Sequence, residues 1–348
     1  MQILKKIFLG VFAFAIILVI VYMLGPKLEQ IDLEVHYPQT EIQDVEEYIR
    51  SREDTVKGLK PGNGAYVVWA DSLTKAKTPI SIVYIHGFGA SPMEGDPVHR
   101  FLATHFGANL FVTRLPEHGI NRANAMEYLT PQALADAAGE AYKVGKAIGD
   151  EVIIIGTSTG GSLALLLASQ QPDIKALVTY SPAIRDYGQQ LEAFYSPWMQ
   201  KLMAVTMAEN GVLHVDREGE KKMYWSEDYH MNGYESLAQV FYSGMREETF
   251  KKIDQPLFLG YFYKSEEEQD FVVSVPKMLE MYEQINTPET LKEKKAFPDT
   301  GDHVIASSIT SSDWEGVLFS SIEFLENVVG LVPAEQFDGV DLEPVTLD

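Results

Sequence analysis

A serine between glycines is the strongest chemical signal in this 348-residue sequence. Residues 156–161 read GTSTGG, which contains the pattern G-x-S-x-G, and they directly follow the apolar run Glu151–Ile155. An Ala/Leu-rich helix is predicted over Gly161–Ser169. A serine on a sharp turn between a buried strand and a helix exposes its hydroxyl at the edge of the sheet. We therefore predict that Ser158 is a nucleophile; the alternative is an ordinary glycine-rich turn.

A serine hydroxyl needs a base, and His303 is the histidine best placed to act as one. It lies in a turn-rich segment, residues 298–304, between the last predicted strand and the last predicted helix. The sequence holds eight histidines but no H-E-x-x-H or similar spacing, so no metal is expected. The base needs an orienting carboxylate. We assign that role to Asp270, because the Phe-Val-Val after it would pin it against the core; the acidic run 266–268 is the rival.

Two backbone N–H groups must meet the oxyanion that forms when a serine attacks a carbonyl. The N–H of Thr159, directly after the predicted nucleophile, is one candidate. The second is the N–H of Phe88, in the segment 86–91 (HGFGAS) that follows the predicted strand Ile80–Ile85. Glycines on either side of Phe88 would let this loop approach the serine closely. A simple turn is again the alternative.

Alternating strands and helices surround these residues. Strands are predicted at residues 64–70, 80–85, 109–113, 151–155, 176–180, 256–263 and 292–297. Helices are predicted at residues 98–106, 131–148, 161–169, 275–285 and 314–329. The alternation favours an α/β fold with a mostly parallel sheet covered by helices on both faces. A loop at the edge where the strands end can then bring His303 to Ser158.

The segment at about 185–250 interrupts this alternation and differs in composition. Its 66 residues hold 11 aromatic residues and 6 methionines, against 38 and 12 in the whole chain. Flexible methionines beside large rings suit an adaptable apolar surface. We predict a helical cap that partly faces the substrate, with Trp198, Met199 and Met203 as contacts. The alternative is that these side chains form only the cap's own core.

An uncharged apolar run, Ile7–Leu24, begins the chain, with Lys5 and Lys6 before it and Gly-Pro-Lys at 25–27 after it. As a helix it would be roughly 27 Å long, close to the hydrocarbon thickness of a bilayer. We predict an uncleaved membrane anchor over residues 1–27; a cleaved signal peptide and a buried core helix are the alternatives. The flanking lysines favour a cytoplasmic N-terminus, with the rest of the chain extracytoplasmic, either periplasmic or extracellular.

The remaining divisions follow from composition. Residues 28–62 are polar and acidic and are interpreted as a stalk and lead-in, residues 63–330 as the catalytic domain, and residues 331–348 as an acidic tail. The net charge of −22 argues against nucleic-acid binding, because phosphate backbones would be repelled. The absence of cysteine excludes disulfides, thiolate metal sites and a cysteine nucleophile.

Residues from about 64 to 329 resemble an α/β-hydrolase-fold serine hydrolase of the monoacylglycerol lipase and carboxylesterase type. Five motifs match in order: HGFG at 86–89, LPEHG at 115–119, GTSTGG at 156–161, DFVV at 270–273 and GDH at 301–303. The resemblance implies an inserted cap. Relatives usually have glycine where this chain has Glu117, which places a carboxylate near the mouth of the pocket. We assign Glu117, His86 and Gly87 to substrate binding.

These features together predict hydrolysis of a carboxylic ester through an acyl-enzyme, without a cofactor. The substrate expected is a small-molecule acyl ester, such as a monoglyceride or a lysolipid. A peptidase or amidase with the same triad is one alternative, and a non-catalytic binding protein on a hydrolase scaffold is another. The sequence does not indicate the oligomeric state, the length of the acyl chain or the alcohol.

Overall fold

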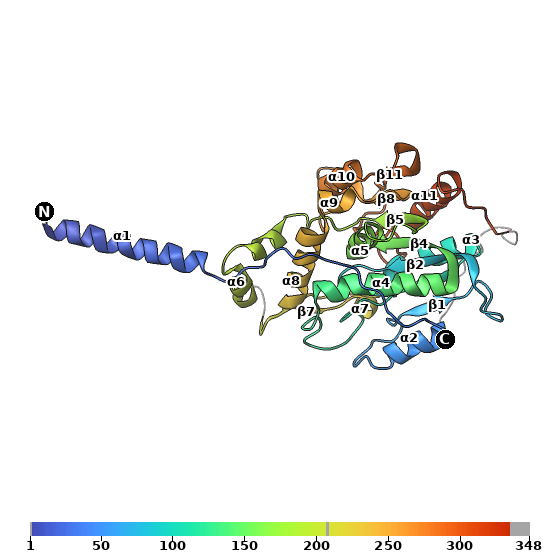
Figure 1. The fold of residues 1–348 in the computed structure, drawn as a ribbon, viewed down its shortest axis with the longest axis horizontal. Coiled ribbons are helices and arrows are strands. Elements are labelled where there is room, and N and C mark those ends of the chain that lie inside the picture. Colours follow the sequence, from blue (N-terminus) through green and yellow to red (C-terminus); the bar gives the residue numbers. More distant parts are fainter. Residues whose placement is uncertain (1, 207–208, 335–348) are drawn as a thin grey trace.

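A mostly parallel sheet is the centre of the fold in the computed structural model, which describes residues 2–206 and 209–334 (Figure 1). Within these residues, seven strands follow the order β1-β3-β2-β4-β5-β8-β11, and only the β1–β3 pair is antiparallel. The strands are β1 (Tyr66–Val68), β2 (Thr78–Ile85), β3 (Asn109–Val112), β4 (Gly149–Thr157), β5 (Ala176–Tyr180), β8 (Leu257–Tyr261) and β11 (Lys292–Ala296). This sheet confirms the prediction of an α/β fold built on a mostly parallel sheet.

Helices cover both faces of this sheet. The helices α4 (Pro131–Ile148), α5 (Thr159–Ala168) and α10 (Val275–Gln284) share one apolar cluster, and α3 (Val98–His105) and α11 (Trp314–Asn327) share another. Successive side chains of a strand point to opposite faces. Accordingly, Ile154 of β4 lies in the first cluster and Ile153 in the second, both fully buried.

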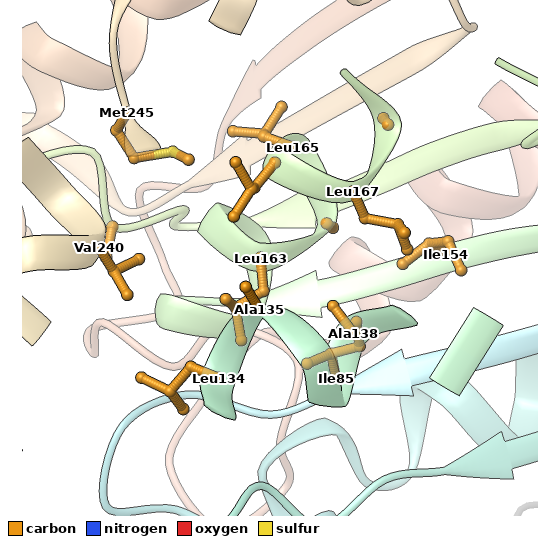
Figure 2. Close-up of a cluster of buried hydrophobic side chains, with 14 of the residues drawn as sticks. Ile85, Leu134, Ala135, Ala138, Ile154, Leu163, Leu165, Leu167, Val240 and Met245 are labelled. Carbon is orange, nitrogen blue, oxygen red and sulfur yellow. The ribbon is translucent and has the colours of Figure 1, made fainter. Parts of the chain in front are cut away.

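The α5 helix is buried along its whole length, which fixes the turn that precedes it. Figure 2 shows Leu163, Leu165 and Leu167 of α5 beside alanines of α4 and the strand residue Ile154. Every residue of α5 is buried. An all-round apolar helix of this kind is typical of the interior of an α/β protein.

The cap lies between β5 and β8 and combines short helices with a small hairpin. Its elements are η2 (Gln190–Tyr195), α6 (Met199–Thr206), β6 (Val212–His214), α7 (Lys221–Tyr224), β7 (Asp228–His230), α8 (Met231–Gln239), η3 (Val240–Gly244) and α9 (Glu247–Phe250). β6 and β7 pair antiparallel, which the prediction of a purely helical cap did not include. Val240 and Met245 belong to the same apolar cluster as the leucines of α5 (Figure 2), so this end of the cap is anchored to the sheet layer.

A second hairpin follows β8, where one longer strand was predicted. β8 ends at Tyr261, and the chain then forms β9 (Tyr263–Ser265) and β10 (Glu268–Gln269) as an antiparallel pair. The hairpin returns the chain to its starting point, because the N–H of Asp270 donates to the carbonyl oxygen of Phe262 at 3.2 Å. Asp270 therefore lies beside the end of β8 despite the intervening residues. The turn η4 (Glu289–Leu291) leads into β11, and η1 (Pro92–Gly95) lies between β2 and α3.

Residues 28–62, interpreted from their composition as a stalk and lead-in, lie against the rest of the protein. They pack along the domain and include α2 (Val45–Glu53), begun by an Asp44 side chain that accepts the N–H of Glu47. Leu33, Val35, Val45 and Ile49 are buried in the larger apolar cluster. The few apolar positions of this acidic segment thus suffice to attach it, because they all face the domain.

The N-terminal helix α1 (Gln2–Met23) projects away from the rest of the protein (Figure 1). None of its residues is buried, and it is the one helix in the described part of the chain that is long and apolar enough to cross a membrane. The cap meets its end: the indole N–H of Trp198 donates to the carbonyl of Val21 at 3.0 Å, and its backbone N–H donates to that of Pro26 at 2.8 Å. Of the predicted tail, residues 335–348 lie outside the described residues.

Docking of the lead-in predicts a stability effect. Ile49→Ala in the full-length chain should lower the free energy of unfolding by about 2 kcal/mol, since it removes a buried side chain from the interface with the domain. The melting temperature should fall by roughly 4–8 °C. Leu73→Ala is the matched control, because Leu73 is 94% exposed. An unchanged melting temperature for Ile49→Ala would mean that the segment is not docked in solution.

Candidate active site

Ser158 lies on a tight turn between β4 and α5 that only glycines permit. Its φ of +54° is in the left-handed region that non-glycine residues rarely adopt. A Cβ at Gly160 would lie 1.9 Å from the carbonyl oxygen of Ile85, and one at Gly156 would lie 2.5 Å from that of Gly160. The G-x-S-x-G pattern is therefore a steric requirement. It presents the serine at the carboxyl end of β4, where a nucleophile is accessible.

His303 and Asp270 form a buried hydrogen-bonded pair. Nδ1 of His303 lies 2.6 Å from Oδ2 of Asp270. The other carboxylate oxygen, Oδ1, accepts the N–H groups of Val272 at 2.8 Å and Val273 at 2.9 Å. These bonds fix the carboxylate so that Nδ1 carries the proton and Nε2 is left as the acceptor. Within the described residues, Nε2 is buried and has no hydrogen-bond partner.

Burial and the neighbouring carboxylates, Asp270 foremost, set the basicity of His303. Burial lowers the pKa of the imidazole, but the Asp270 carboxylate, together with the smaller effects of Glu94 and Asp302, raises it, and the net effect is a raised pKa. A raised pKa makes His303 a stronger base toward a hydroxyl group.

Ser158 and His303 face the same cavity, whose volume is about 490 Å³. Thr159 and Phe88, the predicted oxyanion residues, also line it. Thr159 is in the first turn of α5, where backbone N–H groups lack an intrahelical acceptor and the helix dipole favours negative charge. The structure therefore brings the predicted nucleophile, base and oxyanion residues together, with Asp270 behind the base.

The predicted substrate contacts of the cap lie elsewhere. Among the described residues, Trp198, Met199 and Met203 are not part of the cavity lining. Trp198 contacts the end of α1, while Met199 and Met203 pack into the larger apolar cluster. Composition indicated a segment that contributes to the cavity lining but not which of its side chains do so, because tertiary packing decides which apolar side chains of the cap face the cavity.

The loop residues assigned to substrate binding also have structural surroundings. His86 is fully buried; its Nε2 accepts the N–H of Leu115 at 3.0 Å, and burial holds the pKa of the imidazole well below its usual range. Glu117 pairs with Arg122. Neither lines the described cavity. Gly87 approaches the site by backbone alone, since a Cβ there would lie 2.8 Å from Cβ of Ser158.

Charged and aromatic residues that the sequence analysis did not single out line the cavity instead. They are the acids Glu94 from η1, Asp302 beside His303 and Asp186 from the cap, and the cap residues Arg217, Lys221, Trp225, Tyr229, Tyr234 and Phe241. Lys221 Nζ contacts Asp302 Oδ2 at 2.9 Å, which ties the cap to the loop of His303. The available sequence signals were the aromatic content of the cap and the GDH motif that contains Asp302; the other charged residues carry no motif. No group of three His, Asp or Glu suited to a metal occurs in the described residues.

Residues 82–305 match the alpha/beta hydrolase family, and the chain belongs to that family. Among curated proteins, none matches this sequence. In fold it resembles a structure from work on LipS and LipT, two metagenome-derived lipolytic enzymes, with 19% identity and a TM-score of 0.62 over 77% of this chain and 99% of that one.

Two further solved structures share the fold. One is the monoacylglycerol lipase of Paleococcus ferrophilus, with 13% identity and a TM-score of 0.54 over 75% of this chain and 98% of that one. The other is a soluble variant of the monoglyceride lipase of Saccharomyces cerevisiae, with 15% identity and a TM-score of 0.55 over 86% and 97%. At these identities the likeness establishes the fold, and it agrees with assignment to a hydrolase family.

The geometry predicts one reactive serine. A fluorophosphonate probe should label the full-length protein at Ser158, because a neighbouring base and an accessible hydroxyl are what such probes require. Ser158→Ala should abolish labelling, measured by in-gel fluorescence and peptide mapping. Ser169→Ala, at the other end of α5, is the control that should label normally. Persistent labelling of Ser158→Ala would place the reactive group elsewhere.

Proposed function

We propose that this protein is a serine hydrolase that cleaves carboxylic esters through a Ser158–His303–Asp270 triad. The observation that carries the proposal is the state of His303: Nδ1 is bound to a buried carboxylate, and Nε2 is unoccupied beside the cavity that Ser158 lines. Membership of the alpha/beta hydrolase family and the lipase and esterase folds that it resembles support the same reaction class.

In the proposed reaction Ser158 Oγ attacks the ester carbonyl carbon while Nε2 of His303 takes the hydroxyl proton. The N–H groups of Thr159 and Phe88 stabilise the oxyanion. His303 then returns the proton to the leaving alcohol, and an acyl-enzyme forms. Water, deprotonated by His303, attacks this second ester and releases the carboxylic acid and the free serine. The sum is ester plus water to acid plus alcohol.

The cavity lining favours an amphiphilic ester with an anionic group. Phe88, Tyr229, Tyr234 and other apolar side chains suit an acyl chain. Arg217 donates only to neutral oxygens, the carbonyl of Ser226 at 2.9 Å and the hydroxyl of Tyr229 at 2.8 Å. Within the described residues it has no carboxylate partner, whereas Lys221 is neutralised by Asp302. Arg217 therefore suits the phosphate of a lysolipid better than it suits a neutral monoglyceride.

A substrate panel tests the function. The full-length protein in detergent should hydrolyse p-nitrophenyl acyl esters faster than the matched anilides, and Ser158→Ala should lower kcat by about 10³-fold or more. With equal acyl chains, lysophospholipid should be preferred over monoacylglycerol. Arg217→Met should lower the ratio of their kcat/KM values by about 10-fold, because a charge-assisted hydrogen bond is lost.

Matched variants make the panel decisive. Arg217→Lys keeps the positive charge and should retain most of the lysophospholipid preference. Activity that survives Ser158→Ala would refute the triad mechanism, and an unchanged ratio in Arg217→Met would refute the anionic substrate alone. Absence of turnover across the panel, with an unreactive Ser158, would favour the non-catalytic alternative.

We further propose that α1 spans a membrane with the N-terminus in the cytoplasm and the catalytic domain outside it. The support is the length and apolar character of α1 and the two lysines before its apolar run. The chain has no cysteine, so single introduced cysteines report topology cleanly. Leu73→Cys should react with an impermeant maleimide on intact spheroplasts, and Gln2→Cys only after lysis. The reverse pattern would invert the topology, and release of the protein into the medium would indicate cleavage.

A further inference from the structure

A buried carboxyl group beside the proposed triad is not used by the mechanism above. Glu94 lies in η1, eight positions after His86, and is only 2% exposed. Its side chain nonetheless lines the cavity together with Ser158 and His303. Acidic side chains are almost never fully buried without a partner, so its contacts bear on its role.

The contacts of Glu94 connect it to the oxyanion loop. Its Oε2 accepts the N–H of Gly87 at 2.5 Å and lies 3.4 Å from the hydroxyl of Tyr84. A Cβ at Gly87 would lie 2.8 Å from Cβ of Ser158 and 3.0 Å from Oε1 of Glu94. The backbone of Gly87 thus fits between the nucleophile and the carboxyl group. Phe88, whose N–H is the proposed oxyanion donor, is the next residue.

The charges around Glu94 are few and are shared with the triad. His303 and Asp302 face it from the loop after β11, Tyr84 faces it from β2, and Tyr229 faces it from β7. Within the described residues no lysine or arginine forms an ion pair with it. Burial raises the pKa of Glu94 to about 7, although the Gly87 hydrogen bond and His303 act in the opposite direction. The charge of Glu94 is therefore coupled to that of His303, because each group shifts the pKa of the other.

We propose that Glu94 is a positioning residue of the active centre, which holds the oxyanion loop through Gly87 and adjusts the basicity of His303 through its charge. The inference rests on the proposed function, because it assigns Glu94 a part in the same reaction. Ionised Glu94 favours the imidazolium form of His303 and so adds to the effect of Asp270. As an acceptor for Gly87, it also keeps the adjacent Phe88 N–H in place.

The sign of the pH effect follows directly. Catalysis needs neutral His303, so the acid limb of kcat/KM reports the pKa of this imidazole in the free enzyme. A negative Glu94 raises that pKa, and removing the charge lowers it. Glu94→Gln should therefore move the acid limb to lower pH by about 0.5–1 unit. Glutamine has nearly the same shape and still offers an oxygen to the N–H of Gly87.

Two variants separate the charge from the hydrogen bond. Glu94→Gln should keep kcat at its own optimum within about threefold, because the acceptor remains, whereas Glu94→Leu should lower kcat by about 10-fold or more with a smaller change in KM. Glu267→Gln is the control for net charge, since it removes a carboxylate from the exposed β9–β10 turn. Melting temperatures identify any variant that has lost its fold.

The decisive measurement is the pKa of His303 itself, obtained by NMR titration of histidine-labelled full-length protein in detergent. The expected result is a lower pKa in Glu94→Gln than in wild type and Glu267→Gln, with the acid limb displaced equally. A folded Glu94→Gln protein with the wild-type His303 pKa overturns the proposal. This titration needs no turnover, so failure of the proposed function, seen as activity that survives Ser158→Ala, is distinguished from failure of the role of Glu94.

Discussion

The close approach of Gly160 to the end of β2 is the contact on which the site depends. A side chain at Gly160 would collide with the carbonyl oxygens of Ile85 and His86, so the first turn of α5 can press against the strand end only as bare backbone. The same contact fixes two parts at once. It holds Ser158 in its unusual conformation, and it brings the loop that begins at His86 against the serine. This one contact therefore positions both the proposed nucleophile and the proposed oxyanion loop.

Much of the fold could be predicted from the sequence because buried parallel strands leave a continuous apolar run, as residues 152–155 do. Two members of the proposed triad, Ser158 and His303, could be predicted because turn-rich motifs mark them in the sequence. Asp270 was harder, because the β9–β10 hairpin separates it from β8 in sequence while returning it in space. Asp270 is therefore distant from the end of β8 along the sequence but adjacent to it in the folded protein.

The cavity lining could not be predicted in the same way. Trp198 and Met203 are apolar like much of the cavity lining, but Trp198 contacts the end of α1 and Met203 packs into the larger apolar cluster, so neither reaches the cavity. Glu94 has no sequence motif; the single turn η1 folds it back toward Gly87. Arg217 is one of two cations, with Lys221, among the residues that line the cavity, and the net charge of −22 gives no sign that a cation without a carboxylate partner lies there.

The docked lead-in also determines how the domain is mounted on α1. If residues 28–62 were a flexible linker, the distance between its two ends would be about 30 Å on average, and the domain could move relative to α1 over that range. Because Leu33, Val35 and Ile49 are buried in the domain, only the few residues around Gly25 and Pro26 remain as a joint, and Trp198 bonds to both sides of it. With α1 in a bilayer, the cavity would be held at a fixed distance from the lipid surface, because the domain is attached to α1 by a short joint and not by a long flexible linker.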